Sequence, residues 1–404
     1  MDYQALTVVA GFAFIYSLVA SRLERTPISG ALVYVIVGFL CSPYVFHLID
    51  IDIDGEGLSR LAELTLALVL FTDSANTDLA TLRKVESIPV RLLLIGLPLT
   101  ILFGFGVAYL IFDGLGLFEL ALLATMLAPT DAALGKAVVT NEAVPDSVRD
   151  SLNVESGLND GICVPVLLFF LALAAGQTDA GEAAGLAVKL PLEAIGIGAL
   201  VGIAGGVLGS RVLEFCTQRT WVSGTWLQIP VIALALLCFG ASQWLGGSGF
   251  IACFVGGLIF GGLAKQHKKE YLDAAEGIGD FMALVTWFAF GAAAIGLTWQ
   301  FLDWRVGVYA LLSLTVVRIL PVFLCVFRLK LQFDTTLFMG WFGPRGLASI
   351  VFVVMVLAAK LPGSNILLTT VTWTILLSIT LHGITANPLA AVYGAKAEQR
   401  GGKI

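Results

Sequence analysis

Long apolar runs recur along almost the whole sequence, and each is bounded by charged residues or by glycine and proline. A run of about 20 apolar residues is what an α-helix needs to cross the hydrocarbon core of a membrane. Only 13% of the 404 residues are charged, whereas soluble proteins carry roughly 25%. This charge is too sparse to cover a globular surface in water, so the sequence predicts an all-α polytopic membrane protein.

The apolar runs predict about thirteen transmembrane helices within a single membrane domain, residues 1–404. The predicted spans are residues 5–21, 29–49, 60–82, 89–112, 117–140, 147–175, 186–210, 226–245, 249–264, 278–298, 304–327, 334–359 and 365–393. Most lysines and arginines, among them Arg83, Lys84 and Lys136, fall on one side of this arrangement. Because cytoplasmic loops are enriched in basic residues, we expect an outside N-terminus and a cytoplasmic C-terminus, in a prokaryotic inner membrane.

Several classes of function are excluded by composition and spacing. The net charge of −6 leaves no basic patch for nucleic acid. The six cysteines stand singly in apolar runs, so neither a zinc site nor a disulfide framework is predicted. A hydrolase needs a nucleophile beside an oriented base, and His47, His267 and His382 show no such spacing. We therefore predict no catalytic residues and no cofactor.

Ionisable residues inside the predicted spans are the strongest functional signal. They are Asp73, Asp131, Glu155, Asp160, Arg318 and Arg345. Each costs ~2.5–3.5 kcal/mol at the centre of a membrane helix, so these side chains must pair with one another or line water. Asp73 lies toward the inner end of its span, where it is either part of an entrance funnel or a solvated helix end.

Two of the spans carry helix-breaking sequences. Span 117–140 contains Pro129-Thr130-Asp131, and span 334–359 contains Gly343-Pro344-Arg345-Gly346. Proline lacks an N–H and clashes with the preceding turn, while threonine and aspartate are good N-caps. Each sequence therefore predicts two half-helices that meet within the membrane. The alternative is an ordinary proline kink that neighbouring helices relieve.

The positions of these two interruptions match. They fall in the fifth and twelfth spans, which predicts two six-helix repeats, residues 1–175 and 226–393, joined by a linker helix at 186–210. With an odd number of linking helices, the repeats have inverted topology. Interrupted spans in corresponding positions of two repeats indicate the binding site of a transporter.

Span 147–175 supplies further polar groups. Residues four apart share a helix face, so Ser156 and Asp160 share one face and Glu155 and Asn159 the next. A hydroxyl and a carboxylate suit a hard monovalent cation. Asn159 can hydrogen-bond Glu155, whose charge needs a partner such as Arg318. A buried carboxylate at Asp160 can hold either a proton or a cation, and this competition is enough for exchange if access alternates.

These motifs resemble those of NhaP-like Na⁺/H⁺ antiporters in the monovalent cation:proton antiporter family, over nearly the whole chain. The resemblance implies a homodimer in which a six-helix core moves like an elevator against a dimerisation domain. It also implies that Asp160 carries the proton or the cation and that Glu155 and Arg318 form a stabilising ion pair. The implied co-ligands of Na⁺ are Asp131, Ser156 and the Thr130 backbone, with Asn159 and Arg345 in support.

The residue before Asp160 bears on stoichiometry. An asparagine there, Asn159, resembles the electroneutral branch of the family, since one titrating carboxylate exchanges one proton for one cation. We therefore expect exchange of Na⁺ or Li⁺ for H⁺ across a lipid bilayer. K⁺/H⁺ exchange is the nearest alternative, because cavity size decides between these ions, and a cation channel is a more distant one. Stoichiometric, saturable exchange would distinguish an antiporter from a channel.

Overall fold

The computed structural model is helical throughout the part of the chain that it describes, with no strand in that part. The described residues are 3–23, 26, 29–53, 55–77, 88–131, 134, 138, 141, 143–176, 183–264 and 267–400. The basic residues Arg83, Lys84 and Lys136, which helped to set the expected orientation, lie outside this part.

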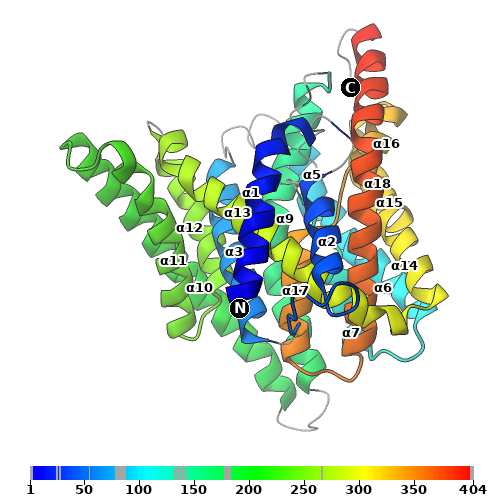
Figure 1. Ribbon diagram of the computed structural model, residues 1–404. Helices are drawn as coiled ribbons and strands as arrows, with labels where there is room; N and C mark the ends of the chain where they lie inside the picture. The colour runs from blue at the N-terminus through cyan, green and yellow to red at the C-terminus, as the bar shows by residue number, and fades with distance from the viewer. Residues whose placement is uncertain are drawn as a thin grey trace. The chain divides into compact units, whose positions relative to one another are not determined.

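The α-helices carry the labels of Figure 1, and the short 3-10 or π-helices between them are called η. They are α1 (Tyr3–Leu23), α2 (Gly30–Cys41), α3 (Glu56–Asn76), α5 (Ile88–Arg91), η1 (Leu92–Gly96), α6 (Leu97–Ile111), α7 (Leu117–Met126), α9 (Asp146–Gly176), α10 (Ala183–Gln218), η2 (Gly224–Leu227), α11 (Ile229–Trp244), α12 (Gly249–Leu263), α13 (Lys268–Thr298), η3 (Trp299–Phe301), α14 (Trp304–Leu314), α15 (Val316–Val326), η4 (Phe327–Leu329), α16 (Phe333–Trp341), α17 (Leu347–Ala358) and α18 (Ser364–Gln399).

The described helices have the lengths and the apolar character of membrane spans. Eight helical stretches are long and apolar enough to cross a membrane, and α2, α7, α12 and α17 are shorter apolar helices. The chain is therefore an all-helical, multi-pass membrane protein, as its apolar runs predicted. Helix α13 begins at Lys268, ten residues before the predicted span at 278, because its charged first turns extend the helix beyond the apolar run.

Helix ends fall inside the two spans that contain helix-breaking sequences. Helix α7 ends at Met126, and residues 128–131 after it have no helical structure. Helix α16 ends at Trp341, and α17 begins at Leu347. We call residues 342–346 the connecting segment. Both stretches place backbone N–H and C=O groups outside the helical ladder, so these groups need other partners.

The chain divides into two compact units. The first comprises residues 1–60, 85–159 and 284–404. Within it α6 packs along α7, α14 along α18, and α15 against α16. An apolar core cluster joins helices α5, η1, α9, α15, α16 and α18 through buried side chains that include Leu92, Val148, Val326 and Met339. This core holds the end of α16, which leads into the connecting segment.

The second unit comprises residues 61–84 and 160–283. Its green helices α10, α11 and α12 lie side by side in Figure 1. Helices α10 and α12 approach closely because glycines one turn apart face the other backbone. A Cβ built on Gly198, Gly202 or Gly206 would come within 2.6–2.7 Å of a carbonyl oxygen of α12 or of the residue before it. Small residues allow this kind of backbone contact between membrane helices.

Candidate functional site

Asp131, which follows the end of α7, caps the start of α17. Its Oδ2 accepts a hydrogen bond from the Leu347 backbone N–H at 2.8 Å, and its own N–H donates to the Pro344 carbonyl oxygen at 2.8 Å. Its Oδ1 accepts from the Leu134 N–H at 3.2 Å. The carboxylate thus lies at the positive end of the α17 dipole, where negative charge is stabilised.

Arg345, in the connecting segment, makes the reverse contact with α7. Its side chain is fully buried, and its Nη1 donates to the carbonyl oxygens of Ala128 and Pro129 at 2.7 and 3.1 Å. Ser349 Oγ donates to the Met126 carbonyl at 2.7 Å. These carbonyls lie just beyond or at the end of α7, the negative end of a helix dipole. Each interrupted stretch therefore supplies a charge to the helix end of the other.

The glycines of the connecting segment make room for these charged groups. A Cβ on Gly346 would collide with the Asp131 carboxylate, and one on Gly343 with the Arg318 guanidinium. Neither glycine has the positive φ that would demand it on backbone grounds. Space, rather than backbone conformation, accounts for both residues.

Thr130, Ser156 and Asn159 form a buried polar cluster. The hydroxyl oxygens of Thr130 and Ser156 are 2.9 Å apart, and Asn159 Nδ2 donates to Thr130 Oγ1 at 2.7 Å. All three side chains are nearly inaccessible to solvent. Asn159 Oδ1 is buried and accepts no hydrogen bond from the described residues. The cluster joins α9 to the stretch after α7 and presents several oxygen atoms in a small volume.

Glu155 and Arg318 form a buried ion pair. Arg318 Nη1 and Nη2 donate to Glu155 Oε1 and Oε2 at 2.5 and 2.7 Å. The arginine side chain is 3% exposed and the glutamate side chain 2%. The predicted Asn159–Glu155 hydrogen bond is wrong: Asn159 Nδ2 donates to Thr130 Oγ1 instead, while the Glu155 carboxylate oxygens accept from Arg318. A bidentate pair of this kind is the strongest arrangement for two such groups.

The two remaining acids of the prediction belong to the second unit. Asp160 follows Asn159 directly on α9 and is half-buried. It lies one helical turn after Ser156, which the helix pattern predicted. Asp73 is half-buried one turn before the end of α3, and its carbonyl oxygen accepts from the Thr77 N–H at 3.1 Å.

The sequence analysis missed several polar residues that hold the interrupted stretches. They are Ser349 on α17, together with Ser378 and His382 on α18, and no role was predicted for His382. A further buried residue, Glu119 on α7, joins the start of its own helix to the start of α18. Glu119 is buried and accepts from the N–H groups of Gly116 and Gly363 at 2.8 and 2.7 Å. The sequence contained a sign of this role for Glu119, because a glutamate at the third position of a helix is half of a capping box.

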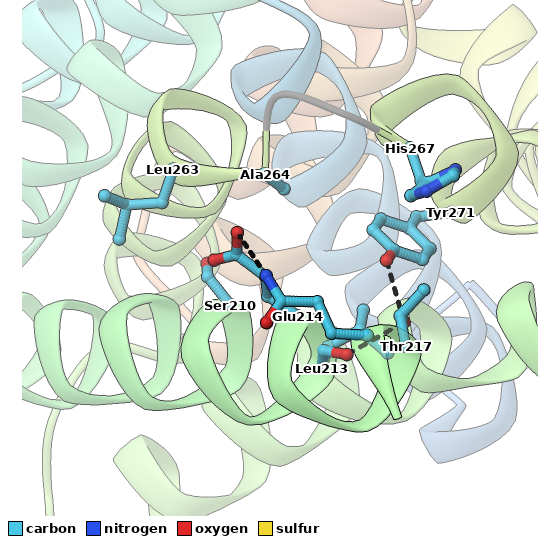
Figure 2. Close-up of a pocket in the computed structure, with 9 residues that line it drawn as sticks. Ser210, Leu213, Glu214, Thr217, Leu263, Ala264, His267 and Tyr271 are labelled. Atoms are coloured by element: carbon cyan, nitrogen blue, oxygen red, sulfur yellow. Dashed lines mark hydrogen bonds between the residues drawn. The ribbon is translucent and has the colours of Figure 1, made fainter. Parts of the chain in front are cut away.

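A pocket in the second unit is separate from these residues. It has a volume of about 250 Å³ and is lined by α10, the end of α12 and the start of α13 (Figure 2). Its hydroxyls are already engaged: Tyr271 donates to Thr217 Oγ1 at 2.9 Å, and Thr217 to the Leu213 carbonyl at 2.8 Å. None of the predicted site residues lines it, so we assign it no function.

Comparisons with known proteins point to one family. The family model "Sodium/hydrogen exchanger, transmembrane" matches residues 10–392. A "K(+)/H(+) antiporter NhaP2" of Shewanella sp. (strain MR-4) is 25% identical over 342 residues, or 84% of this chain and 58% of the relative. A "K(+)/H(+) antiporter NhaP" of Alkalimonas amylolytica is 23% identical over 397 residues, or 96% of this chain and 67% of the relative. The chain thus spans little more than half the length of the Shewanella relative.

The fold also matches a solved structure. The sodium proton antiporter MjNhaP1 from Methanocaldococcus jannaschii aligns with a TM-score of 0.76 at 20% identity. The alignment covers 96% of this chain and 98% of that one. At this identity the match establishes the fold.

Proposed function

We propose that this chain, which belongs to the sodium/hydrogen exchanger family, exchanges Na⁺ or Li⁺ for H⁺ across the inner membrane. The resemblance to NhaP-like antiporters that the motifs predicted is confirmed by the family model and by relatives of that name. The family consists of transporters rather than enzymes, and monovalent cations and protons are its substrates.

The observation that carries the proposal is the buried oxygen cluster beside Asp131. The hydroxyls of Thr130 and Ser156 are 2.9 Å apart, and Asn159 donates to the first of them. Hard cations prefer oxygen ligands of this kind. We propose that Thr130, Ser156, Asp131 and Asp160 bind Na⁺, with Asp160 carrying either the cation or the proton.

The supporting residues have structural roles in this proposal. Glu155 and Arg318 hold α9 to α15 through their ion pair. Arg345 stabilises the carbonyls that follow α7, and we propose that α7 and the α16–α17 pair are the interrupted helices of two inverted repeats. Asp73 remains a candidate funnel residue. Without such compensation, groups like these are costly in a membrane.

The rest of the proposal follows the family resemblance. We propose thirteen transmembrane helices, an outside N-terminus and a cytoplasmic C-terminus. We also propose that two copies form a homodimer in which one part of each copy moves like an elevator. Because Asp160 is the one carboxylate of the site that we propose to exchange its proton, each cation replaces one proton, so exchange is electroneutral.

The test is flux in proteoliposomes. A Na⁺ gradient is imposed, internal pH is read with a dye, and the voltage is clamped with K⁺ and valinomycin. We expect proton movement that is unaffected by the clamp and absent in Asp160→Asn. The matched control is Asp150→Asn, the same substitution at an exposed position of the same helix, which should exchange normally.

Each outcome bears on a different part of the proposal. Exchange that persists in Asp160→Asn would remove Asp160 from the site. Flux that depends on the clamp would contradict electroneutral stoichiometry. Ion movement without coupled proton movement would indicate a channel.

K⁺/H⁺ exchange is the second candidate, and the names of two relatives favour it. A "Na(+)/H(+) antiporter" of Schizosaccharomyces pombe, 25% identical over 263 residues, favours the first. Parallel vesicles without valinomycin should receive Na⁺, Li⁺ or K⁺ gradients of equal size. A larger pH change with K⁺ than with Na⁺ would decide for the second candidate.

A further inference from the structure

The last residue of α16 and Arg345 of the connecting segment both contact a single turn of α18. The carbonyl oxygen of Trp341, the last residue of α16, lies 2.9 Å from His382 Nε2. The backbone N–H of Arg345, near the other end, donates to Ser378 Oγ at 2.7 Å. Ser378 and His382 are four residues apart in a continuous helix, so they share one face. One helical turn thus spans the gap between α16 and α17.

The chemistry of these groups assigns the protons. A carbonyl oxygen only accepts, so His382 Nε2 must carry the proton that faces Trp341. His382 Nδ1 lies 3.2 Å from Ser378 Oγ and 2.9 Å from the Ser378 carbonyl oxygen. In a neutral imidazole with its proton on Nε2, Nδ1 is an acceptor, and a carbonyl oxygen has no proton to donate to it. Ser378 Oγ–H is therefore the group that donates to Nδ1.

The result is a continuous chain of hydrogen bonds across α18. The Arg345 N–H donates to Ser378 Oγ, the Ser378 hydroxyl donates to His382 Nδ1, and His382 Nε2–H donates to the Trp341 carbonyl. Ser378 and His382 are 0% and 2% exposed, so bulk water cannot readily replace a missing partner. A buried group without its partner is costly. A further hydrogen bond, from Trp341 Nε1 to Thr385 Oγ1 at 2.9 Å, ties the tryptophan ring to the next turn.

We propose that Ser378 and His382 are positioning residues that hold the connecting segment, so that Arg345 and Asp131 keep their contacts with the opposite helix ends. The Arg345 guanidinium reaches the Ala128 and Pro129 carbonyls only while its own backbone is fixed. The Asp131 N–H likewise donates to Pro344, one residue from the Arg345 N–H that Ser378 accepts. Neither Ser378 nor His382 is proposed as a ligand of the cation. The effect on transport rests on the proposed function, whereas the effect on the segment does not.

Backbone hydrogen exchange of the full-length protein in detergent tests the effect on the segment. The variants are Ser378→Ala and His382→Leu, which break the chain, and His382→Gln, which keeps an N–H donor and an acceptor. The control is Thr380→Val, because the Thr380 hydroxyl bonds the Leu376 carbonyl of its own helix. We expect peptides covering 341–346 to exchange about tenfold faster in Ser378→Ala and His382→Leu, since a buried hydrogen bond is removed. His382→Gln and Thr380→Val should match wild type.

Transport then separates positioning from general destabilisation. In variants with unchanged thermal unfolding, Ser378→Ala and His382→Leu should raise the half-saturating cation concentration about tenfold, because a single buried hydrogen bond changes an equilibrium by about that factor. His382→Gln should restore it. Unchanged exchange at 341–346 in both breaking variants would overturn the inference, as would an equal rise in Thr380→Val. If wild type moves no cation, the proposed function fails, while the hydrogen-exchange result still decides the inference.

Discussion

The connecting segment at 342–346 and the contact between α10 and α12 both bring backbones close together, but by different means. Along α10 the close approach rests on missing side chains: Gly198, Gly202 and Gly206 face carbonyl oxygens at and just before α12. At the connecting segment it rests on polar side chains, because Arg345, Ser378 and His382 supply the partners that the backbone lacks.

We propose that this difference separates a structural contact from one that bears on transport. Glycine-mediated contacts are held by dispersion, which is non-directional and leaves no buried polar group unpaired when the helices shift. The hydrogen bonds of buried charges are directional. In an interior of low dielectric constant, no water molecule replaces a partner that has been removed. We therefore expect changes at the connecting segment to alter transport, and changes at the α10–α12 contact to alter stability alone.

The largest effect is expected from Arg318→Leu, which leaves Glu155 charged, buried and unpaired. Such a change costs about 3–5 kcal/mol of stability, measured as unfolding in detergent. The matched control is Arg305→Leu, which breaks an ion pair with Asp113 whose side chains are 39% and 80% exposed. Replacing Glu155 and Arg318 together by leucine should recover much of the stability. If Arg318→Leu were as stable as Arg305→Leu, the buried pair would not hold α9 to α15.

The second largest effect is expected from Gly346→Ala, which should reduce transport. The new methyl group would meet the Asp131 carboxylate, which must then leave the start of α17. Overpacking of this kind costs about 1–3 kcal/mol, and the flux assay should show a clear decrease in exchange. Gly307→Ala on α14 is the control, since nothing lies within 4 Å of its added Cβ. Normal exchange in Gly346→Ala would mean that the Asp131 cap is dispensable.

Gly206→Ala tests the other side of the comparison. Its Cβ would come within 2.7 Å of the Gly256 carbonyl oxygen, so α10 and α12 must separate slightly, at a cost of about 1–2 kcal/mol. The thermal unfolding temperature should fall while the half-saturating cation concentration stays that of wild type. Gly240→Ala on α11, which has open space around its Cβ, should change neither quantity. A shift in cation affinity as large as that of Gly346→Ala would refute the distinction drawn above.

The smallest effect is expected at Asp334, in the first turn of α16, whose pair with Arg400 lies outside the eight helical stretches that are long enough to cross a membrane. The hydrogen bond from Arg400 holds the pKa of Asp334 below its ordinary value of 3.8. A lowered folded-state pKa adds stability above the unfolded-state pKa, and this stability disappears as the pH falls through the folded-state value. Asp334→Asn should therefore lower thermal stability slightly at neutral pH, and the difference should shrink as the pH falls below the ordinary pKa of 3.8. An equal difference at both pH values would contradict this origin.

Local sequence rules predicted part of the candidate site. The cost of burying charge indicated a partner for Glu155, and the structure pairs it with Arg318. Proline and glycine indicated where α7 and α16 end, because their backbone limits act within a few residues. The same rules failed for Asn159, since helical spacing permits a bond to Glu155 but does not reveal that Thr130 lies 2.7 Å away.

The sequence by itself determined that the chain is helical, that it lies in a membrane and that its few buried charges need partners. These are consequences of how lipid treats apolar runs and unpaired charge, and they need no knowledge of neighbours. Only the tertiary structure decided which partners meet. Arg345 bonds carbonyls more than 200 residues away in sequence, and Ser378 and His382 join Arg345 to the end of α16 from another helix. Such contacts depend on how helices pack, a property of the whole fold that local spacing does not contain.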